Sequence, residues 1–189
     1  MKFSEYLELF KLPATEAELS DPHSHAHFTK LNDARIHRWI NHGVLSDEIK
    51  QVMSQIQAPQ KWVLITETWC GDAAHLVPFI YLISQLSSQV TLEVQIRDTD
   101  SEINQYLTNG AMAIPKLIIR DESGADIAVW GPRPETCHAY FVSLKEQGMD
   151  IDAQKLELQK WYNADKGVSI QAELCQLVSK INERSSMIV

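Results

Sequence analysis

A single cysteine, Cys70, stands between a hydrophobic segment and a predicted helix in TETWCGDAAHLVPF, residues 66–79. A thiol at a helix start lies near unpaired backbone N–H groups and the positive end of the helix dipole, which stabilise its thiolate. Asp72 opposes this effect, because its carboxylate competes for those N–H groups and repels a thiolate, although it could also transfer a proton to a leaving thiol. The pattern favours a reactive cysteine, and a cysteine that only packs is the alternative.

Two further cysteines are far from Cys70 in the sequence. Cys137 lies about one turn into a later predicted helix, and it could resolve a disulfide on Cys70 only if the Cα atoms approach within about 7 Å. Cys175, in AELCQLV, lies on the apolar face of a terminal helix and is expected in the core. Three cysteines at wide spacings indicate neither a disulfide framework nor a paired zinc motif.

The histidines include one possible ligand cluster. His23, His25 and His27 in HSHAH would align on one side of an extended backbone, as metal ligands can. The segment supplies neither a fourth ligand nor an acidic partner, so we expect no metal and no other cofactor. His75 follows Cys70 by five residues, which is a rotation of roughly 140° away from the thiol at about 100° per residue, so we expect it on the surface.

Charge limits the classes of partner. A formal net charge of −8 and a pI near 5.3, without any run of Lys and Arg, argue against nucleic acid and anionic membranes as partners, since both need a basic patch. No segment has the roughly 20 consecutive apolar residues of a spanning helix, and the N-terminal segment carries acids where a signal peptide would be apolar. We therefore expect a cytoplasmic protein.

The elements that must position these residues begin with helices. Residues 2–12 and 15–19 have helical composition, and HFTKLNDARIHRWINHG has apolar residues near helical spacing until Gly43. Ser46 is expected to cap SDEIKQVMSQIQ. The sequence thus predicts three helices in an N-terminal extension over residues 1–58.

Residues 59–148 are expected to form the core of a single domain. KWVLIT and TLEVQIRD have the pattern of strands, and the helix between them runs from about Gly71 to about Leu86 with a kink at Pro78. SEINQYLTNG then suggests a short helix, and PKLIIRD and ADIAVW suggest two strands joined by the hairpin turn DESG. The helix PETCHAYFVSLKEQG completes a β-α-β-α-β-β-α order.

The remaining residues, 149–189, predict two helices separated at Lys166 and Gly167. Neither helix has a core of its own, so they are expected to form a C-terminal extension and not a second domain. The tail RSSMIV is expected to fray.

This element order and three segments together resemble the thioredoxin superfamily, in particular a bacterial thioredoxin-like subfamily whose active-site strand leads into WCGD. The segments are ITETWCGDAAHLVP at 65–78, IRDTDSEINQYLTNGAMAIPKLII at 96–119 and VWGPRPE at 129–135. KLNDARIHRWI, with Asn32, Arg35 and Arg38, is similar to that subfamily's N-terminal helix. The resemblance covers about residues 30–147 and implies an α/β thioredoxin-like fold with a central mixed sheet.

The resemblance implies that Cys70 is the attacking thiol, with Pro115 beside it in cis and the backbone of Ile114 free to pair with an extended substrate. A trans proline opening an edge strand is the alternative. The family's second cysteine falls on Ala73, so a two-cysteine cycle within this motif is impossible. Arg133 could provide a positive charge for a thiolate or for a carboxylate of glutathione, or it could be a solvated surface residue. The other residues expected to contact substrate are Trp69, Gly71, Asp72, Trp130 and Gly131.

The expected function is weak thiol-disulfide exchange by a single active-site cysteine. Its substrates would be protein disulfides or mixed disulfides with a low-molecular-weight thiol such as glutathione. An external thiol, or Cys137 as a possible resolving residue, would release the product. The alternative is a redox-inactive module that holds a partner peptide in the groove beside Pro115.

Overall fold

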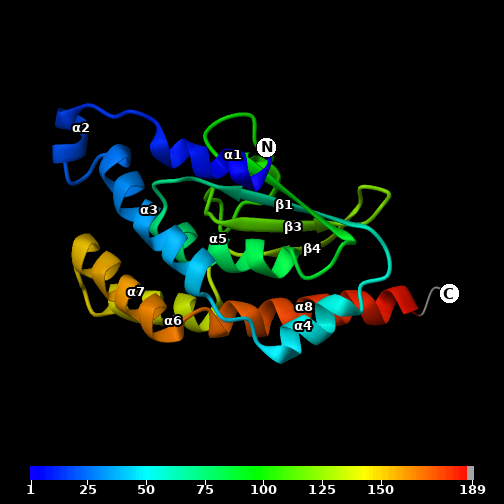
Figure 1. The fold of residues 1–189 in the computed structure, drawn as a ribbon. Coiled ribbons are helices and arrows are strands. Elements are labelled where there is room, and N and C mark those ends of the chain that lie inside the picture. Colours follow the sequence, from blue (N-terminus) through cyan, green and yellow to red (C-terminus); the bar gives the residue numbers. More distant parts are fainter. Residues whose placement is uncertain (187–189) are drawn as a thin grey trace.

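The computed structural model describes residues 1–186, and its centre is a four-stranded mixed sheet in the order β2-β1-β3-β4 (Figure 1). β1 (Gln60–Thr66) pairs in parallel with β2 (Val90–Ile96) and antiparallel with β3 (Lys116–Arg120). β3 pairs antiparallel with β4 (Asp126–Trp130). This arrangement confirms the predicted α/β class with a thioredoxin-like core.

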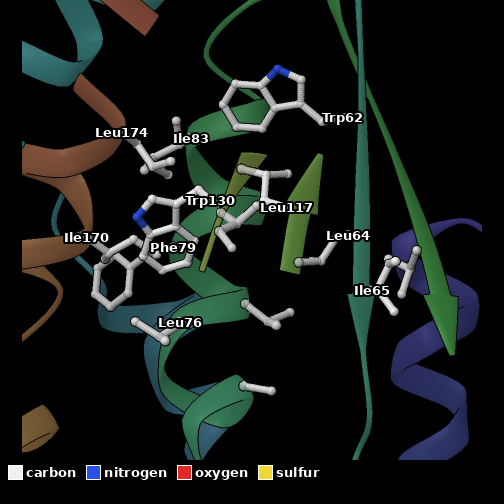
Figure 2. Close-up of a cluster of buried hydrophobic side chains, with 14 of the residues drawn as sticks. Trp62, Leu64, Ile65, Leu76, Phe79, Ile83, Leu117, Trp130, Ile170 and Leu174 are labelled. Carbon is white, nitrogen blue, oxygen red and sulfur yellow. The ribbon is translucent and has the colours of Figure 1, made fainter. Parts of the chain in front are cut away.

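β1 lies at the centre because both of its faces are apolar. Its residues Trp62–Ile65 are fully buried, which is expected of a strand that is covered on both sides. Figure 2 shows Leu64 directed towards α5 (Gly71–Ser84) and Ile65 directed to the opposite face of the sheet. Each such side chain contributes roughly 1.5–3 kcal/mol through its burial. The strand thereby fixes the point at which Cys70 leaves the sheet.

The N-terminal extension contains α1 (Phe3–Glu8), the 3-10 turn η1 (Leu9–Lys11), α2 (Glu16–Ser20), α3 (His25–His42) and α4 (Asp47–Ser54). Four α-helices therefore precede β1, and the predicted number of three was wrong. The two segments expected to be helical, residues 2–12 and 15–19, are separated at Pro13, which cannot donate a backbone hydrogen bond. The side chains of Thr15, Ser24 and Ser46 each accept from a backbone N–H at a helix start.

The segment before β3 forms one 3-10 turn, η2 (Ile103–Gln105), where a short helix was expected. The chain cannot extend this turn because Asn109 and Gly110 both adopt positive φ, and Thr108 pairs with Ala111 in a reversal. The hairpin turn between β3 and β4 forms as predicted, with Gly124 at a φ of +84°.

Three helices complete the described chain: α6 (Glu135–Glu146), α7 (Ile151–Asp165) and α8 (Val168–Ser186). α7 and α8 meet at Lys166 and Gly167 as predicted, with both residues at positive φ. The buried apolar cluster runs from Phe3 through β1 to Ile181, so both extensions share the core of the sheet. Residues 184–186 of the expected frayed tail belong to α8, and the remainder of that prediction lies outside the described residues.

Candidate functional site

Cys70 is the N-cap residue of α5, immediately after the turn that follows β1. Its thiol donates to the carbonyl oxygen of Ile114 with an Sγ to O distance of 3.6 Å, and its exposed fraction is 9 %. The Ile114–Pro115 peptide bond is cis. Because β1 and β3 are neighbours in the sheet, the end of one strand and the loop before the other bring Cys70 against Pro115.

Burial, followed by the charge of Asp72, raises the pKa of the Cys70 thiol to about 12. The backbone N–H groups of Ala73 and Asp72 and the charge of Arg133 act in the opposite direction. The lowering of the pKa by the helix terminus is therefore smaller than its raising by burial, and the Cys70 thiol is protonated at neutral pH. Ala73 is fully buried, so the position of the family's second thiol is filled by packed core.

Asp72 is held by two partners from the C-terminal half of the chain. The Arg133 guanidinium lies 2.6 Å from Oδ2 of Asp72, and the hydroxyl of Tyr162 donates to Oδ1 at 2.8 Å. Arg133 also stacks on the ring of Phe141 at 4.2 Å. Burial alone would lower the pKa of Arg133, but the carboxylate of Asp72 raises it. Arg133 thus supplies positive charge near Cys70 while its ion pair is made with Asp72.

Cys137 is fully buried on α6, beside Tyr162. Burial raises the pKa of its thiol to about 12, and the neighbouring Tyr162 hydroxyl acts in the opposite direction. For Cys137 to resolve a disulfide on Cys70, it would first have to leave this buried position.

Trp130 and Gly131 differ in their relation to the site. Trp130 is buried, donates from Nε1 to Glu173 at 2.7 Å, and lies among core side chains (Figure 2). Its indole is directed into the core, and its expected contact with substrate stays a prediction. Gly131 has a φ of +108°, and a Cβ there would lie 2.3 Å from the carbonyl oxygen of Pro115. The buried Lys116 donates to the Gly131 carbonyl at 3.1 Å, which fixes this loop against Pro115.

His75 is not on the surface, contrary to the prediction, because α3 and α7 cover that face of α5. Only 3 % of the residue is exposed. Trp39 of α3 donates from Nε1 to Nδ1 of His75 at 2.9 Å, and Nε2 of His75 lies 2.7 Å from Oε1 of Gln159 on α7. Burial lowers the pKa of His75 to about 4, so the imidazole is neutral and its Nε2–H donates to Gln159. The ring also stacks on Tyr162 with centroids 4.8 Å apart.

Trp69 forms a stacked arrangement at the edge of the site. His25 lies parallel to its ring with centroids 4.3 Å apart, and the guanidinium of Arg97 lies 4.7 Å from the ring centroid. Within residues 1–186, no group of three His, Cys, Asp or Glu side chains is placed to hold a metal ion.

A cleft of about 540 Å³ opens beside Trp69, Cys70 and Gly71. We name it the α3–α7 cleft, because α7, α3 and the turn before α3 supply the remaining lining residues: Pro22, His23, His25, Phe28, Leu31, Arg35, Asp152, Lys155, Leu156 and Gln159. Asp72, Ile114, Pro115, Trp130, Gly131 and Arg133 do not line it. The expected substrate-contacting residues therefore divide into two sets, which meet at Cys70.

Several site residues were not anticipated from the sequence. The contributions of Gln159 and Tyr162 depend on how α7 packs against α5, which periodicity does not reveal. Asn32 gave the clearest available signal, since it shares the buried face of α3 with Ile36 and Trp39 at helical spacing, and a buried amide requires partners. It donates from Nδ2 to the carbonyl of Thr68 at 2.9 Å.

Comparison with known proteins relates residues 19–147 to one family and nearly the whole chain to one type of fold. A family described as Thioredoxin matches residues 19–147. A protein of unknown function from Pseudomonas aeruginosa has a similar structure, with a TM-score of 0.58, 14% sequence identity and coverage of 96% of this chain and 99% of that chain. An HIV epitope-scaffold is similarly related, with a TM-score of 0.57, 14% identity and coverage of 95% and 99%. A comparison with curated proteins found no match. Among the described residues, no helix has the length and apolar character needed to cross a membrane.

Proposed function

Because this chain belongs to the thioredoxin family, we propose that it performs thiol-disulfide exchange with Cys70 as the single attacking thiol. One observation carries the proposal: Cys70 starts α5 and points its Sγ at the Ile114 carbonyl, beside the cis Ile114–Pro115 bond. The WCGD segment, which resembles a bacterial thioredoxin-like subfamily, supports the same assignment. A family member lacking the second thiol at position 73 retains the first half of the exchange reaction.

The proposed substrates are protein disulfides or mixed disulfides with a low-molecular-weight thiol such as glutathione. The Cys70 thiol first loses its proton, and its sulfur then attacks one sulfur of the substrate, whose S–S bond breaks as the other half leaves as a thiolate. An external thiol reverses this step and releases the product. Release needs a supply of reduced external thiol, which the cytoplasm provides, so the proposal includes a cytoplasmic location.

Deprotonation limits the proposed reaction, because burial and Asp72 hold the thiol in its neutral form. With a thiol pKa of about 12, the thiolate fraction at pH 7 is on the order of 10⁻⁵, and exchange is correspondingly slow. The same observation favours a second candidate function, in which the groove beside Pro115 holds a partner peptide and Cys70 performs no chemistry.

The experiment is to incubate the reduced protein with oxidised glutathione and follow adduct formation by intact mass and peptide mapping. Cys175 is partly exposed and provides an internal reference thiol. We expect an adduct on Cys70 in the wild type and in Cys137→Ser, and none at that position in Cys70→Ser. A bridge between Cys70 and Cys137 would instead assign Cys137 the resolving role.

If no adduct forms on Cys70 up to about pH 10 while Cys175 is modified, exchange is not the function of this site. The peptide-binding alternative would then be the surviving candidate. It predicts that Cys70→Ser retains binding to an extended peptide in the groove beside Pro115.

A further inference from the structure

The α3–α7 cleft adjoins the thiol but takes no part in the exchange step described above. Its walls are apolar: Trp69 and Phe28 present rings, and Leu31 and Leu156 line the cleft although 44% and 57% of these residues are exposed. When an apolar molecule fills the space between the two helices, the exposed leucine side chains are removed from water, which favours binding. The volume of about 540 Å³ is within the range of small-molecule sites.

The charge of the cleft is opposite to that of the whole chain. Four of its lining residues, His23, His25, Arg35 and Lys155, carry or can carry positive charge, and its one acid is Asp152, in a chain with a formal net charge of −8. Asp152 accepts from Lys155 at 3.0 Å and so neutralises that lysine. An anion repelled by the rest of the surface would therefore be attracted to Arg35.

Arg35 is the cation in the cleft that lacks a carboxylate partner within residues 1–186. Its Nη1 donates to Oδ1 of Asn32 at 2.8 Å, which leaves the rest of the guanidinium fork available to a ligand. Its pKa is lowered by burial and by Arg38, as expected of a guanidinium without a neighbouring carboxylate. A half-buried guanidinium without a carboxylate partner binds most favourably to a planar anion that accepts two of its hydrogen bonds.

Asn32 connects this cation to the reactive thiol. Its amide accepts from Arg35 and donates to the carbonyl of Thr68, two residues before Cys70 in the turn that leads into α5. Asn32 is fully buried, so the connection is rigid. An anion bound at Arg35 would therefore have a fixed position relative to Cys70.

We propose that the α3–α7 cleft selects the substrate of Cys70, and that this substrate is a low-molecular-weight disulfide with an apolar, ring-bearing body and a carboxylate. The carboxylate pairs with Arg35 and the body lies between Phe28, Leu31 and Leu156. The chemical step rests on the proposed function. The Cys70 sulfur bonds to the nearer substrate sulfur and loses its proton to solvent, the S–S bond breaks, and the other half of the substrate leaves as a thiolate.

The first test measures binding without chemistry. Titration of Cys70→Ser with 4-phenylbutyrate, followed by calorimetry and by the indole signals of the protein in NMR, is expected to show saturable binding with a shift of the Trp69 signal. The alcohol 4-phenylbutanol should bind about tenfold more weakly, because it cannot form the charge-assisted pair. Arg35→Gln should remove the preference for the acid, and Arg35→Lys should retain part of it.

The matched control is Arg38→Gln, which removes the same charge from the same helix. Arg38 bonds to Asn163 and stacks on Trp39 but does not line the cleft, so the preference for the acid should persist. Equal binding of the acid and the alcohol to the wild-type cleft, or an equal loss of preference in Arg35→Gln and Arg38→Gln, would overturn the proposal.

The second test uses chemistry at Cys70, followed by peptide mapping. The reagents are 5,5′-dithiobis(2-nitrobenzoate), an anionic aromatic disulfide, and 4,4′-dithiodipyridine, a neutral one. The ratio of their rates at Cys70 is expected to fall about tenfold in Arg35→Gln and to stay constant in Arg38→Gln, since comparison of variants cancels the difference in leaving groups.

The two tests separate this proposal from the proposed function. If Cys70 reacts with both reagents and Arg35→Gln leaves the ratio unchanged, exchange stands and substrate selection by the cleft is wrong. If Cys70 reacts with neither reagent but 4-phenylbutyrate binds through Arg35, the cleft is an anion site and exchange is wrong. Thermal unfolding of each variant, compared with Arg38→Gln, identifies any loss caused by misfolding.

Discussion

The ionisation of Cys70 reflects a competition between local backbone and buried surroundings. The N–H groups at the start of α5 favour the thiolate, whereas burial and the Asp72 carboxylate favour the neutral thiol and raise the pKa to about 12. Arg133 and Tyr162, which lie outside α5, hold the Asp72 carboxylate in place.

Asp72→Asn is expected to lower the pKa of Cys70, since it removes a negative charge and leaves the positive charge of Arg133 uncompensated. Alkylation of Cys70 by iodoacetamide at pH 7.5 should become about tenfold faster. Asp47→Asn, which removes an exposed charge from α4, should leave the rate unchanged. In the wild type the rate should rise continuously above pH 9, and a plateau below that pH would contradict the high pKa.

His75 makes stability depend on pH. Its folded-state pKa of about 4 lies below the ordinary value of 6.5, so the native state binds fewer protons than the unfolded state between these values. Its contribution is therefore fully present above pH 6.5 and is lost as the pH falls towards 4, by about 3 kcal/mol.

His75→Gln should flatten this part of the profile, because its amide can still accept from Trp39 and donate to Gln159 but does not titrate. The measurement is urea unfolding of both proteins between pH 7 and pH 4. Parallel curves for the two proteins would show that His75 is not the group responsible.

At the scale of elements, the antiparallel pairing of β3 with β4 brings the Pro115 loop before β3 against the chain after β4. Gly131→Ala is expected to destabilise the fold by about 3 kcal/mol, because a Cβ would lie 2.3 Å from the Pro115 carbonyl oxygen at a φ of +108°. Gly124→Ala is the matched control: it also has a positive φ, +84°, but nothing lies within 4 Å of its Cβ, so about 1 kcal/mol is expected. Urea unfolding measures both losses, and equal losses would show that the close approach has no energetic effect.

The sequence predicted elements where periodicity and caps were strong, including β1, the α5 position and the helices on either side of Lys166. Prediction failed where packing between elements decides the outcome. For His75, helical rotation indicated the direction of the side chain but not that α3 and α7 cover it. Trp130 likewise ends its strand as predicted, but its indole turns into the core to bond with Glu173 of α8, a contact between segments distant in sequence.

At the scale of the whole molecule, α7 and α8 are integrated with the sheet. Tyr162, Ile170, Leu174 and Val178 are buried in the same cluster as β1, and Gly167 lies against the ring of Phe79. The buried surface is continuous, so removal of α8 would expose the core face of α5 to water.

We therefore expect residues 1–186 to unfold in one cooperative transition. Native-state hydrogen exchange should give Leu174 and Val178 of α8 the same opening free energy as Val63 and Leu64 of β1, since these residues share one core. Circular dichroism and tryptophan fluorescence should report the same urea midpoint. A lower opening free energy confined to α7 and α8 would show that the C-terminal extension unfolds on its own.

The stacking around Trp69 has an optical consequence. The imidazole of His25 stacks on its indole, and the guanidinium of Arg97 also lies over the ring. Trp39, Trp62 and Trp130 are buried, so their emission should be blue-shifted and insensitive to events in the solvent. Trp69 is therefore a natural chromophore beside Cys70 whose emission should change when a ligand displaces His25 or Arg97 from its ring, without any attached dye.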